Sequence, residues 1–209
     1  MIDKLLSKSK LNKLIEKFVR RVFYKHFSAN LLTIIGLILG LLTAFLIFLS
    51  GIFIELKLIF IIISAIIMGI SFFIDALDGT MARLKGITKF GGILDIFCDR
   101  TVEISIIIAL ISTNPSILIW PGIFSLGAIV LCISMFLLVG GAIKAEDLEE
   151  TKKVIYYRHG LMERSETFLF LLSMTLFYPW RFELLWLFAI LVFITAFLRL
   201  RDAYILFKA

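Results

Sequence analysis

Long apolar runs without a charged side chain dominate this sequence. Residues 27–54 contain no Asp, Glu, Lys or Arg, and neither do residues 104–143. A helix needs about 20 mostly apolar residues to cross the hydrocarbon core of a bilayer. With 61% hydrophobic residues and a mean hydropathy of +1.04, the 209-residue chain has room for about six such helices and little else. The sequence therefore predicts an all-α integral membrane protein.

We predict six transmembrane helices. They are expected over residues 27–54, 58–74, 90–112, 118–143, 162–179 and 184–200. Ser28 or Asn30 is expected to cap the first span. The sequence "TNPS" and the following Pro121–Gly122 are expected to break the long uncharged run. Gly36 and Gly40 form a small-xxx-small pair, which allows another helix to approach closely.

The N-terminal segment predicts a different kind of helix. Residues 2–25 have apolar side chains at helical spacing, and Lys and Arg fill many of the remaining positions. A basic amphipathic helix of this kind lies along an anionic membrane surface. A cleaved signal peptide fits poorly, because the apolar run that follows is too long and lacks a small-residue cleavage site. We expect residues 1–26 to form an interfacial juxtamembrane helix and residues 27–209 to form the membrane domain.

The distribution of basic residues predicts the orientation in the membrane. In a six-span layout, twenty of the 22 Lys and Arg residues fall on one side, and only Lys57 and Arg181 fall on the other. An excess of Lys and Arg marks the cytoplasmic side. We therefore expect a multi-pass protein of the cell membrane with both termini and the active site facing the cytoplasm.

Four aspartates lie where the second predicted span ends and the third begins, within "DALDGTMARLKGITKFGGILDIFCDR" (residues 75–100). Asp75 and Asp78 are three residues apart, and Asp95 and Asp99 are four apart, so each pair projects from one face of a helix. A short connection makes these helices antiparallel, so the carboxylates should face each other. Ionised acids in a membrane are costly unless they are paired, hydrated or metal-bound. Oxygen ligands of this kind suit Mg²⁺, Mn²⁺ or Ca²⁺.

Small residues accompany the aspartates. Gly79 and Ala82 follow Asp75 on the same helical face, and Gly91 opens the facing helix. Glycines allow a ligand to approach the backbone closely. Arg83 is suited to bidentate contact with a phosphate. The pattern therefore predicts a phosphate-bearing ligand beside the carboxylates.

The stretches "DALDGTMAR" and "GGILDIFCD" resemble the signature of the CDP-alcohol phosphotransferases, Asp-x2-Asp-Gly-x2-Ala-Arg, a spacer, and Gly-x3-Asp-x3-Asp. The positions that match by type and spacing are Asp75, Asp78, Gly79, Ala82, Arg83, Gly91, Asp95 and Asp99. The spacer, residues 84–90, is one residue shorter than is usual in the family. The segment "SANLLT" resembles the family's Pro-Asn-x-x-Thr at the start of span one, with Ala29 replacing proline.

The resemblance implies transfer of a phosphatidyl-type group from CDP-diacylglycerol, or an ether analogue, to an alcohol, with release of CMP. Asp75, Asp78, Asp95 and Asp99 would hold Mg²⁺ or Mn²⁺. Asp99 would also take the proton of the acceptor hydroxyl as general base. The residues implied to contact the nucleotide are Asn30, Thr33, Asp78, Gly79, Ala82, Arg83 and Gly91. We also expect a homodimer and no nucleic-acid partner.

The acceptor is indicated by a second, shorter resemblance. The sequence "GLMERSE" (residues 160–166) resembles Gly-x-x-Glu-Arg-Ala-Glu-Arg of the phosphatidylinositol-phosphate synthases and their archaeal ether-lipid counterparts, with Thr167 replacing the last Arg. In that branch basic residues bind the acceptor's phosphate, which would assign this role to Lys144, Arg158 and Arg164. Positive-inside anchoring is an equally good interpretation of these three residues. We favour inositol phosphate or glycerol phosphate over serine, choline or ethanolamine.

Two further classes of function stay open at this point. A small cation channel or transporter would need polar groups across the bilayer midplane, and the last three predicted spans offer almost none. A binding or assembly protein that kept the fold and lost catalysis is favoured only by the shortened spacer.

Overall fold

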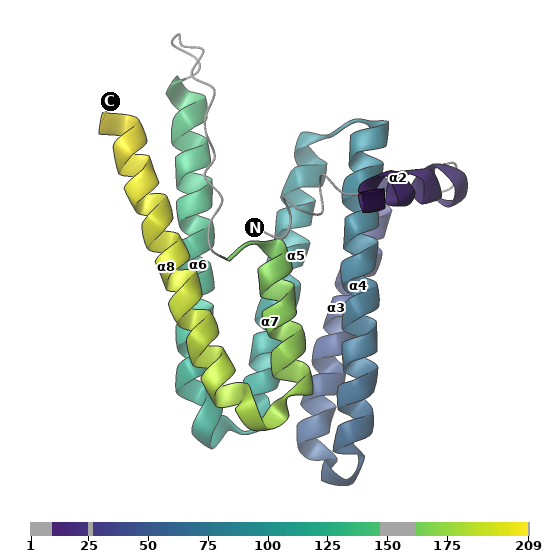
Figure 1. Ribbon diagram of the computed structural model, residues 1–209, viewed down its shortest axis with the longest axis vertical. Helices are drawn as coiled ribbons and strands as arrows, with labels where there is room; N and C mark the ends of the chain where they lie inside the picture. The colour runs from purple at the N-terminus through teal and green to yellow at the C-terminus, as the bar shows by residue number, and fades with distance from the viewer. Residues whose placement is uncertain (1–9, 25–26, 147–161, 209) are drawn as a thin grey trace.

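The computed structural model describes residues 10–24, 27–146 and 162–208, and all regular structure in them is helical (Figure 1). Within these residues, helix α2 precedes six further helices and two short 3₁₀ turns. Their bounds are α2 (Lys10–Val22), α3 (Ala29–Ile52), η1 (Ile54–Leu56), α4 (Lys57–Lys85), α5 (Lys89–Ser112), α6 (Pro115–Glu146), α7 (Arg164–Leu176), η3 (Tyr178–Trp180) and α8 (Arg181–Lys208). The prediction of an all-α protein is confirmed.

Four stretches of the described chain are long and apolar enough to cross a membrane: Ala29–Ile52, Ile54–Lys85, Pro115–Ala142 and Tyr178–Lys208. The protein is therefore a multi-pass membrane protein. Helix α5 carries four charged side chains in its first half, which lowers its hydropathy. Helix α7 has 13 residues, which span about 20 Å and fall short of the hydrocarbon core. The count of six spans stays a prediction.

The helix ends follow from local sequence. Of the two predicted caps, Ser28 caps α3, because its Oγ accepts a hydrogen bond from the Leu31 amide at 3.2 Å. Thr88 caps α5 in the same way, accepting from the Gly91 amide at 3.0 Å. Gly86 ends α4 with a φ of 104°, a conformation that favours glycine. The connection between α4 and α5 is therefore short enough to set these two helices side by side.

The predicted break of the long uncharged run is confirmed at "TNPS", where α5 ends at Ser112 and α6 begins at Pro115. It is wrong at Pro121–Gly122, because α6 continues through both residues. Proline at the first helical position costs nothing, since its missing N–H has no partner there. The chain reverses before Pro115, in the turn that includes Thr113. A side chain on Gly122 would overlap Ile111 of α5, so this glycine serves close packing between α5 and α6. Helices α4 and α8 also extend beyond the predicted second and sixth spans.

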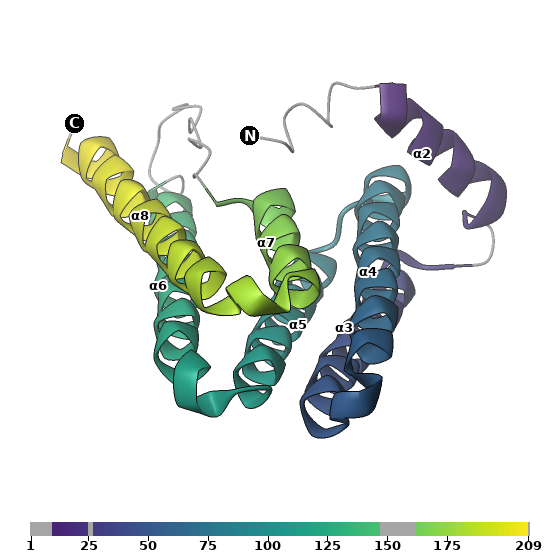
Figure 2. The ribbon, with the colours of Figure 1, turned by 60° about the horizontal axis from the view of Figure 1, so that its bottom comes forward.

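The Gly36–Gly40 pair packs α3 against its neighbours within the same chain. The Ser71 hydroxyl of α4 donates a 2.8 Å hydrogen bond to the Gly36 carbonyl, and Gly40 lies against Val102 of α5. Helices α3 and α4 lie on one side of the molecule and α6 and α8 on the other, with α5 and α7 between them (Figures 1 and 2). The pair is thus used for intrachain packing, and the homodimer stays a prediction.

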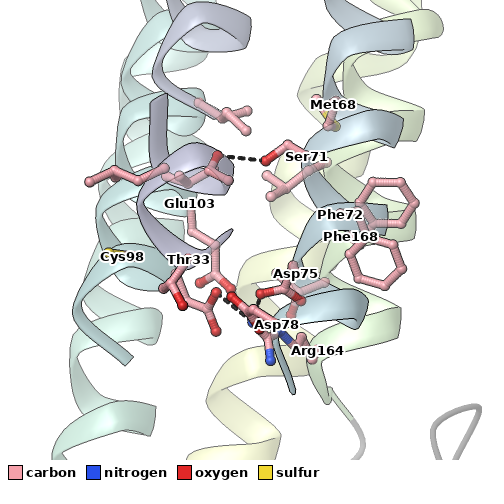
Figure 3. A pocket seen from close by; sticks show the side chains of 17 residues that line it. Thr33, Met68, Ser71, Phe72, Asp75, Asp78, Cys98, Glu103, Arg164 and Phe168 are labelled. Carbon is pink, nitrogen blue, oxygen red and sulfur yellow. Dashed lines mark hydrogen bonds and ion pairs between the residues drawn. The ribbon is translucent and has the colours of Figure 1, made fainter. Parts of the chain in front are cut away.

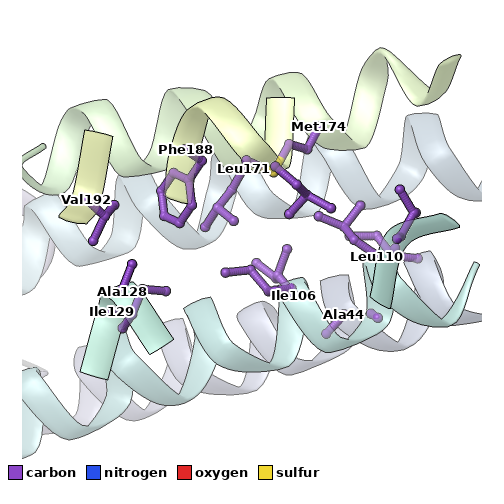
Figure 4. Packing of buried hydrophobic residues seen from close by; sticks show 14 of the residues in the cluster. Ala44, Ile106, Leu110, Ala128, Ile129, Leu171, Met174, Phe188 and Val192 are labelled. Atoms are coloured by element: carbon purple, nitrogen blue, oxygen red, sulfur yellow. The ribbon is translucent and has the colours of Figure 1, made fainter. Parts of the chain in front are cut away.

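Two clusters of buried apolar residues hold these helices together. The larger cluster joins α3, α4, α5, α6, α7 and α8, and includes Ile106, Leu110, Leu171 and Phe188 (Figure 4). The smaller cluster docks α2 through Val19 against Leu32, Leu77 and Met81 of α3 and α4. Lys17, Arg20 and Arg21 on α2 are exposed. The interfacial position of this helix stays a prediction, as does the division into residues 1–26 and 27–209.

We expect Gly40→Ala to destabilise the protein by about 1–3 kcal/mol, because its methyl group would overlap Val102. Unfolding in mixed detergent micelles measures this effect. Gly127→Ala is the matched control, since a β-carbon there meets nothing within 4 Å. Unchanged stability of Gly40→Ala, or failure of Val102→Ala to restore it, would contradict the packing described for α3.

Candidate metal and active site

Three carboxylates from two helices meet at one end of the bundle. Asp75 projects from α4, and Asp95 and Asp99 project from successive turns of α5. One oxygen of each lies within 4.8 Å of the other two. The guanidinium of Arg164, the first residue of α7, donates through Nη2 to all three: to Asp99 at 2.8 Å, to Asp95 at 3.3 Å and to Asp75. Figure 3 shows Arg164 beside Asp75. The predicted convergence of these three aspartates is confirmed.

Asp78 is not among the three carboxylates whose oxygens lie within 4.8 Å of one another, but it lines the first cavity together with Asp75 and Asp99. Its place at the metal stays a prediction. Three residues turn an α-helix by about 300°, which places Asp78 about 60° around α4 from Asp75. It is buried, at 4% exposure, in a cavity wall that also contains Thr33 of α3. Within the described part of the chain, its Oδ2 has no hydrogen-bond partner.

The three carboxylates suit a divalent metal. Mg²⁺ and Mn²⁺ favour oxygen ligands, and opposite ligands of Mg²⁺ lie about 4.2 Å apart. The separation of the Asp75, Asp95 and Asp99 oxygens, within 4.8 Å, is close to this value. A cationic group, the Arg164 guanidinium, already lies among these oxygens. Their geometry therefore fits the predicted Mg²⁺ or Mn²⁺.

A first cavity of about 80 Å³ opens beside the carboxylates, between α3, α4, α5 and α7. One end is polar and is lined by Asp75, Asp78, Asp99 and Arg164. The other end is apolar and is lined by Met68, Phe72, Ile106, Phe168 and Leu171, with the Phe72 and Phe168 rings stacked 4.0 Å apart (Figure 3). A cavity that is charged at one end and apolar at the other suits an amphiphilic ligand.

A second cavity of about 170 Å³ lies on the other side of the carboxylates, between α5, α6, α7 and α8. Three arginines and three acids line it: Arg100, Arg164, Arg199, Asp99, Glu103 and Glu163. Asp99, Glu103, Arg164 and Thr167 line both cavities. A group bound in either cavity would therefore lie beside Asp99.

Two arginines of the second cavity, Arg100 and Arg199, each have one hydrogen-bond donor without a partner among the described residues. Arg100 forms a 2.6 Å ion pair with Glu103 through Nη1, and Arg199 donates through Nη1 to the Cys132 carbonyl at 2.9 Å. The Nε atoms of Arg100 and Arg199 are buried without a hydrogen-bond partner among the described residues. A buried N–H without a partner is costly, and the guanidinium charges of Arg100 and Arg199 beside this cavity suit an anionic ligand.

The remaining predicted residues divide into three groups. Asn30 lies beside Gly91, where a β-carbon would be 3.2 Å from the Asn30 Oδ1. Gly79 and Ala82 lie on α4 beyond Asp78, and the exposed Arg83 donates to the Thr80 hydroxyl at 2.8 Å. The side chain of Lys144, in the last turn of α6, and the whole of Arg158 lie outside the described residues. The roles assigned to these residues stay predictions.

Arg100 and Arg199 are site residues that the sequence analysis missed. Helical spacing does contain a signal, because the buried residues Val192, Thr195 and Ala196 place Arg199 on the same face of α8. Arg100 follows Asp99 directly, and nothing local indicates which neighbouring helix it meets.

Comparisons with known proteins identify the family. A sequence model of the CDP-alcohol phosphatidyltransferase family matches residues 26–200. An archaetidylinositol phosphate synthase from Pyrococcus horikoshii is 39% identical over 79 residues, and the match spans 37% of this chain and 37% of that relative. The chain belongs to the CDP-alcohol phosphatidyltransferase family. Family membership disfavours the cation channel or transporter considered above.

Two solved structures share the fold. The phosphatidylinositol phosphate synthase of Mycobacterium tuberculosis with CDP-DAG bound has a TM-score of 0.69, with 21% identity and 94% coverage of each chain. The same enzyme in complex with manganese and citrate has a TM-score of 0.68, with 22% identity and coverage of 92% of this chain and 88% of that chain. At these identities the comparison establishes the fold alone.

We expect Glu103→Gln to lower stability by about 1–3 kcal/mol, because the mutation removes the charge that pairs with Arg100 in a buried position. Glu16→Gln is the matched control. It removes a similar pair with Arg20, at 2.9 Å, whose side chains are 45% and 59% exposed, and should cost less than about 1 kcal/mol. Unfolding of both variants in mixed micelles compares them. Equal stability losses would show that burial of the Glu103 pair has no effect.

Proposed function

We propose that this protein transfers a phosphatidyl-type group from a CDP-linked lipid to inositol phosphate and releases CMP. The observation that carries the proposal is the position of Asp99, which lies in the carboxylate group and lines both cavities. The amphiphilic first cavity suits the donor, CDP-diacylglycerol or an ether analogue. The arginine-lined second cavity suits a phosphorylated acceptor. The names of the archaeal relative and of the mycobacterial synthase support the same acceptor.

The reaction joins the two substrates at the donor's diphosphate. An acceptor hydroxyl oxygen attacks the phosphorus that carries the lipid, a P–O bond to the acceptor forms, and the P–O bond to CMP breaks. Asp99 takes the proton of this hydroxyl as general base. A bound Mg²⁺ or Mn²⁺, held by Asp75, Asp95 and Asp99, supplies charge neutralisation on the diphosphate.

The nucleotide is assigned to the α3 side of the carboxylates. Asn30 and Gly91 lie together there, and Thr33 and Asp78 share the wall of the first cavity. The buried Asp78 Oδ2 offers an acceptor for a nucleotide hydroxyl or amino group, or for a ligand of the metal. Gly79, Ala82 and Arg83 extend this surface along α4.

The acceptor phosphate is assigned to the second cavity. The unused Nε donors of Arg100 and Arg199 support this assignment, and Arg164 lines the same cavity. Lys144 and Arg158 complete the proposed acceptor-binding set. A cationic head group such as choline would be repelled by these arginines, which is why inositol phosphate is preferred.

We also propose a six-span arrangement with both termini and the active site facing the cytoplasm. The distribution of basic residues supports it, because among the described Lys and Arg residues only Lys57 and Arg181 lie at the opposite end of the bundle. Both are accommodated there. Lys57 lies 4.0 Å from the Tyr178 ring, and the buried Arg181 donates to the Thr113 hydroxyl and the Met174 carbonyl. The proposal includes the homodimer that the family resemblance implies.

We expect the purified protein to release CMP from CDP-diacylglycerol when inositol phosphate and Mn²⁺ are present. Asp99→Asn should reduce the rate at least about 100-fold, because a general base contributes that much or more. Asp202→Asn is the control, since this carboxylate pairs with Arg201 near the end of α8. CMP release is followed with inositol phosphate, glycerol phosphate, serine, choline and ethanolamine. No release with any of them would contradict the proposal and favour a protein that has lost catalysis.

We expect Arg199→Met to raise the KM for inositol phosphate about tenfold, with little change in the KM for the lipid donor. Loss of one charge-assisted hydrogen bond corresponds to about this factor. Arg201→Met, which changes an exposed arginine of the same helix, is the matched control. An increase in both KM values, or in neither, would contradict the assignment of the second cavity to the acceptor.

A further inference from the structure

Arg164 makes an unusual set of contacts for a residue expected to bind the acceptor. A single nitrogen, Nη2, donates to one oxygen of each of Asp75, Asp95 and Asp99. These are the same three residues whose oxygens are grouped closely enough to share a metal ion. The guanidinium therefore contacts all three carboxylates that a divalent cation would need.

The guanidinium and a metal ion exclude each other. Arginine has only donors and stays protonated, so it cannot become a ligand of the metal. Two cations between the same carboxylates would also repel strongly at such short range. Entry of a metal requires Arg164 to leave Asp75, Asp95 and Asp99.

The Arg164 side chain has a second position available to it, in the second cavity. Arg164 is the first residue of α7, and its side chain is 36% exposed, so rotation of the side chain leaves the helix intact. It lines the second cavity as well as the first. Arg100 and Arg199, with their unused Nε donors, line that second cavity too.

We propose that Arg164 is exchanged for the metal. In the metal-free protein its guanidinium neutralises Asp75, Asp95 and Asp99. When a divalent ion enters, the side chain turns into the second cavity and binds the phosphate of the acceptor. Arg164 is thus a positioning residue whose place depends on the metal, and metal binding precedes acceptor binding.

The charges of the second cavity support this order. Three arginines and three acids line it, so their formal charges balance in the metal-free protein. A metal ion bound by Asp99 offsets one of those acids and at the same time releases Arg164. Arg164 is already one of the three arginines, so the excess of positive charge in the cavity comes from the offset of Asp99 by the metal, and the released guanidinium is free to pair with an anionic acceptor. By linkage, the acceptor must in turn strengthen metal binding by the same factor.

The inference rests on the proposed function for the identity of the acceptor. Its central test needs only the metal. Mn²⁺ affinity is measured by calorimetry for the full chain in detergent, with unmodified protein, Arg164→Met and Arg201→Met. Arg164→Met should bind Mn²⁺ at least about tenfold more tightly, since the internal competitor is gone. Arg201→Met removes the same charge beside Asp202 and should bind like the unmodified protein.

Arg164→Lys keeps the charge but offers a compact ammonium with no planar fork. Its Mn²⁺ affinity should lie between those of the unmodified protein and Arg164→Met. The Arg164→Lys variant replaces Arg164→Met in this test if Arg164→Met does not fold. Unchanged or weaker Mn²⁺ binding in both variants would overturn the exchange. Asp95→Asn is expected to lose Mn²⁺ binding whether or not Arg164 is exchanged for the metal. Retained Mn²⁺ binding in this variant would contradict the metal site and not the exchange.

A second measurement follows the acceptor side. Inositol phosphate should bind the unmodified protein more tightly with Mn²⁺ than without it, and this difference should shrink in Arg164→Met. Equal affinities with and without Mn²⁺ in the unmodified protein would overturn the exchange. No binding of inositol phosphate under either condition would contradict the proposed acceptor, and the Mn²⁺ affinities would still decide the role of Arg164.

Discussion

Electrostatic repulsion among Asp75, Asp95 and Asp99 is the constraint on which the rest of the structure depends. Two helices of an apolar bundle bring these carboxylates together, where ionised groups are costly unless a cation offsets them. The protein provides one cation of its own, Arg164, and a geometry that fits a divalent ion. The site is therefore built for a positive charge, and its chemistry depends on which positive charge is present.

Helix packing far from the carboxylates fixes the positions of α5 and α7, which carry Asp95, Asp99 and Arg164. At the opposite end of the short α7, the buried Arg181 donates to the Met174 and Thr175 carbonyls of α7 and to Thr113 after α5. These bonds tie the end of α7 to the end of α5. Because α7 has only 13 residues, fixing one end also fixes the position of Arg164 at the other. Close packing of α3 at Gly40 holds α5 on its other side.

The sequence predicted those parts of the site that depend on short-range spacing. Asp95 and Asp99 lie one helical turn apart, and Gly86 and Thr88 limit the connection to α4, so their meeting with Asp75 follows from local rules. The α5–α8 contact that brings Arg100 near Arg199 joins residues about a hundred positions apart, and no local pattern specifies it. The path of α6 through Pro121 was missed for a related reason, since packing of Gly122 on Ile111 outweighs a local breaker.

The relation between the two cavities bears on why such a site would transfer a group to an alcohol and not to water. Asp99, Glu103 and Thr167 separate an amphiphilic cavity from one lined by arginines, and Glu103 is buried against Arg100. Under the proposed function, Asp99 is in place as the general base before the acceptor phosphate has bound. Water could also reach Asp99 at that stage. If Arg164 must leave the carboxylates before the acceptor site is complete, the metal and the phosphate-anchoring arginine come into place together. Coupling of this kind favours a hydroxyl held by its phosphate over unbound water, because only the former gains the contact with Arg164.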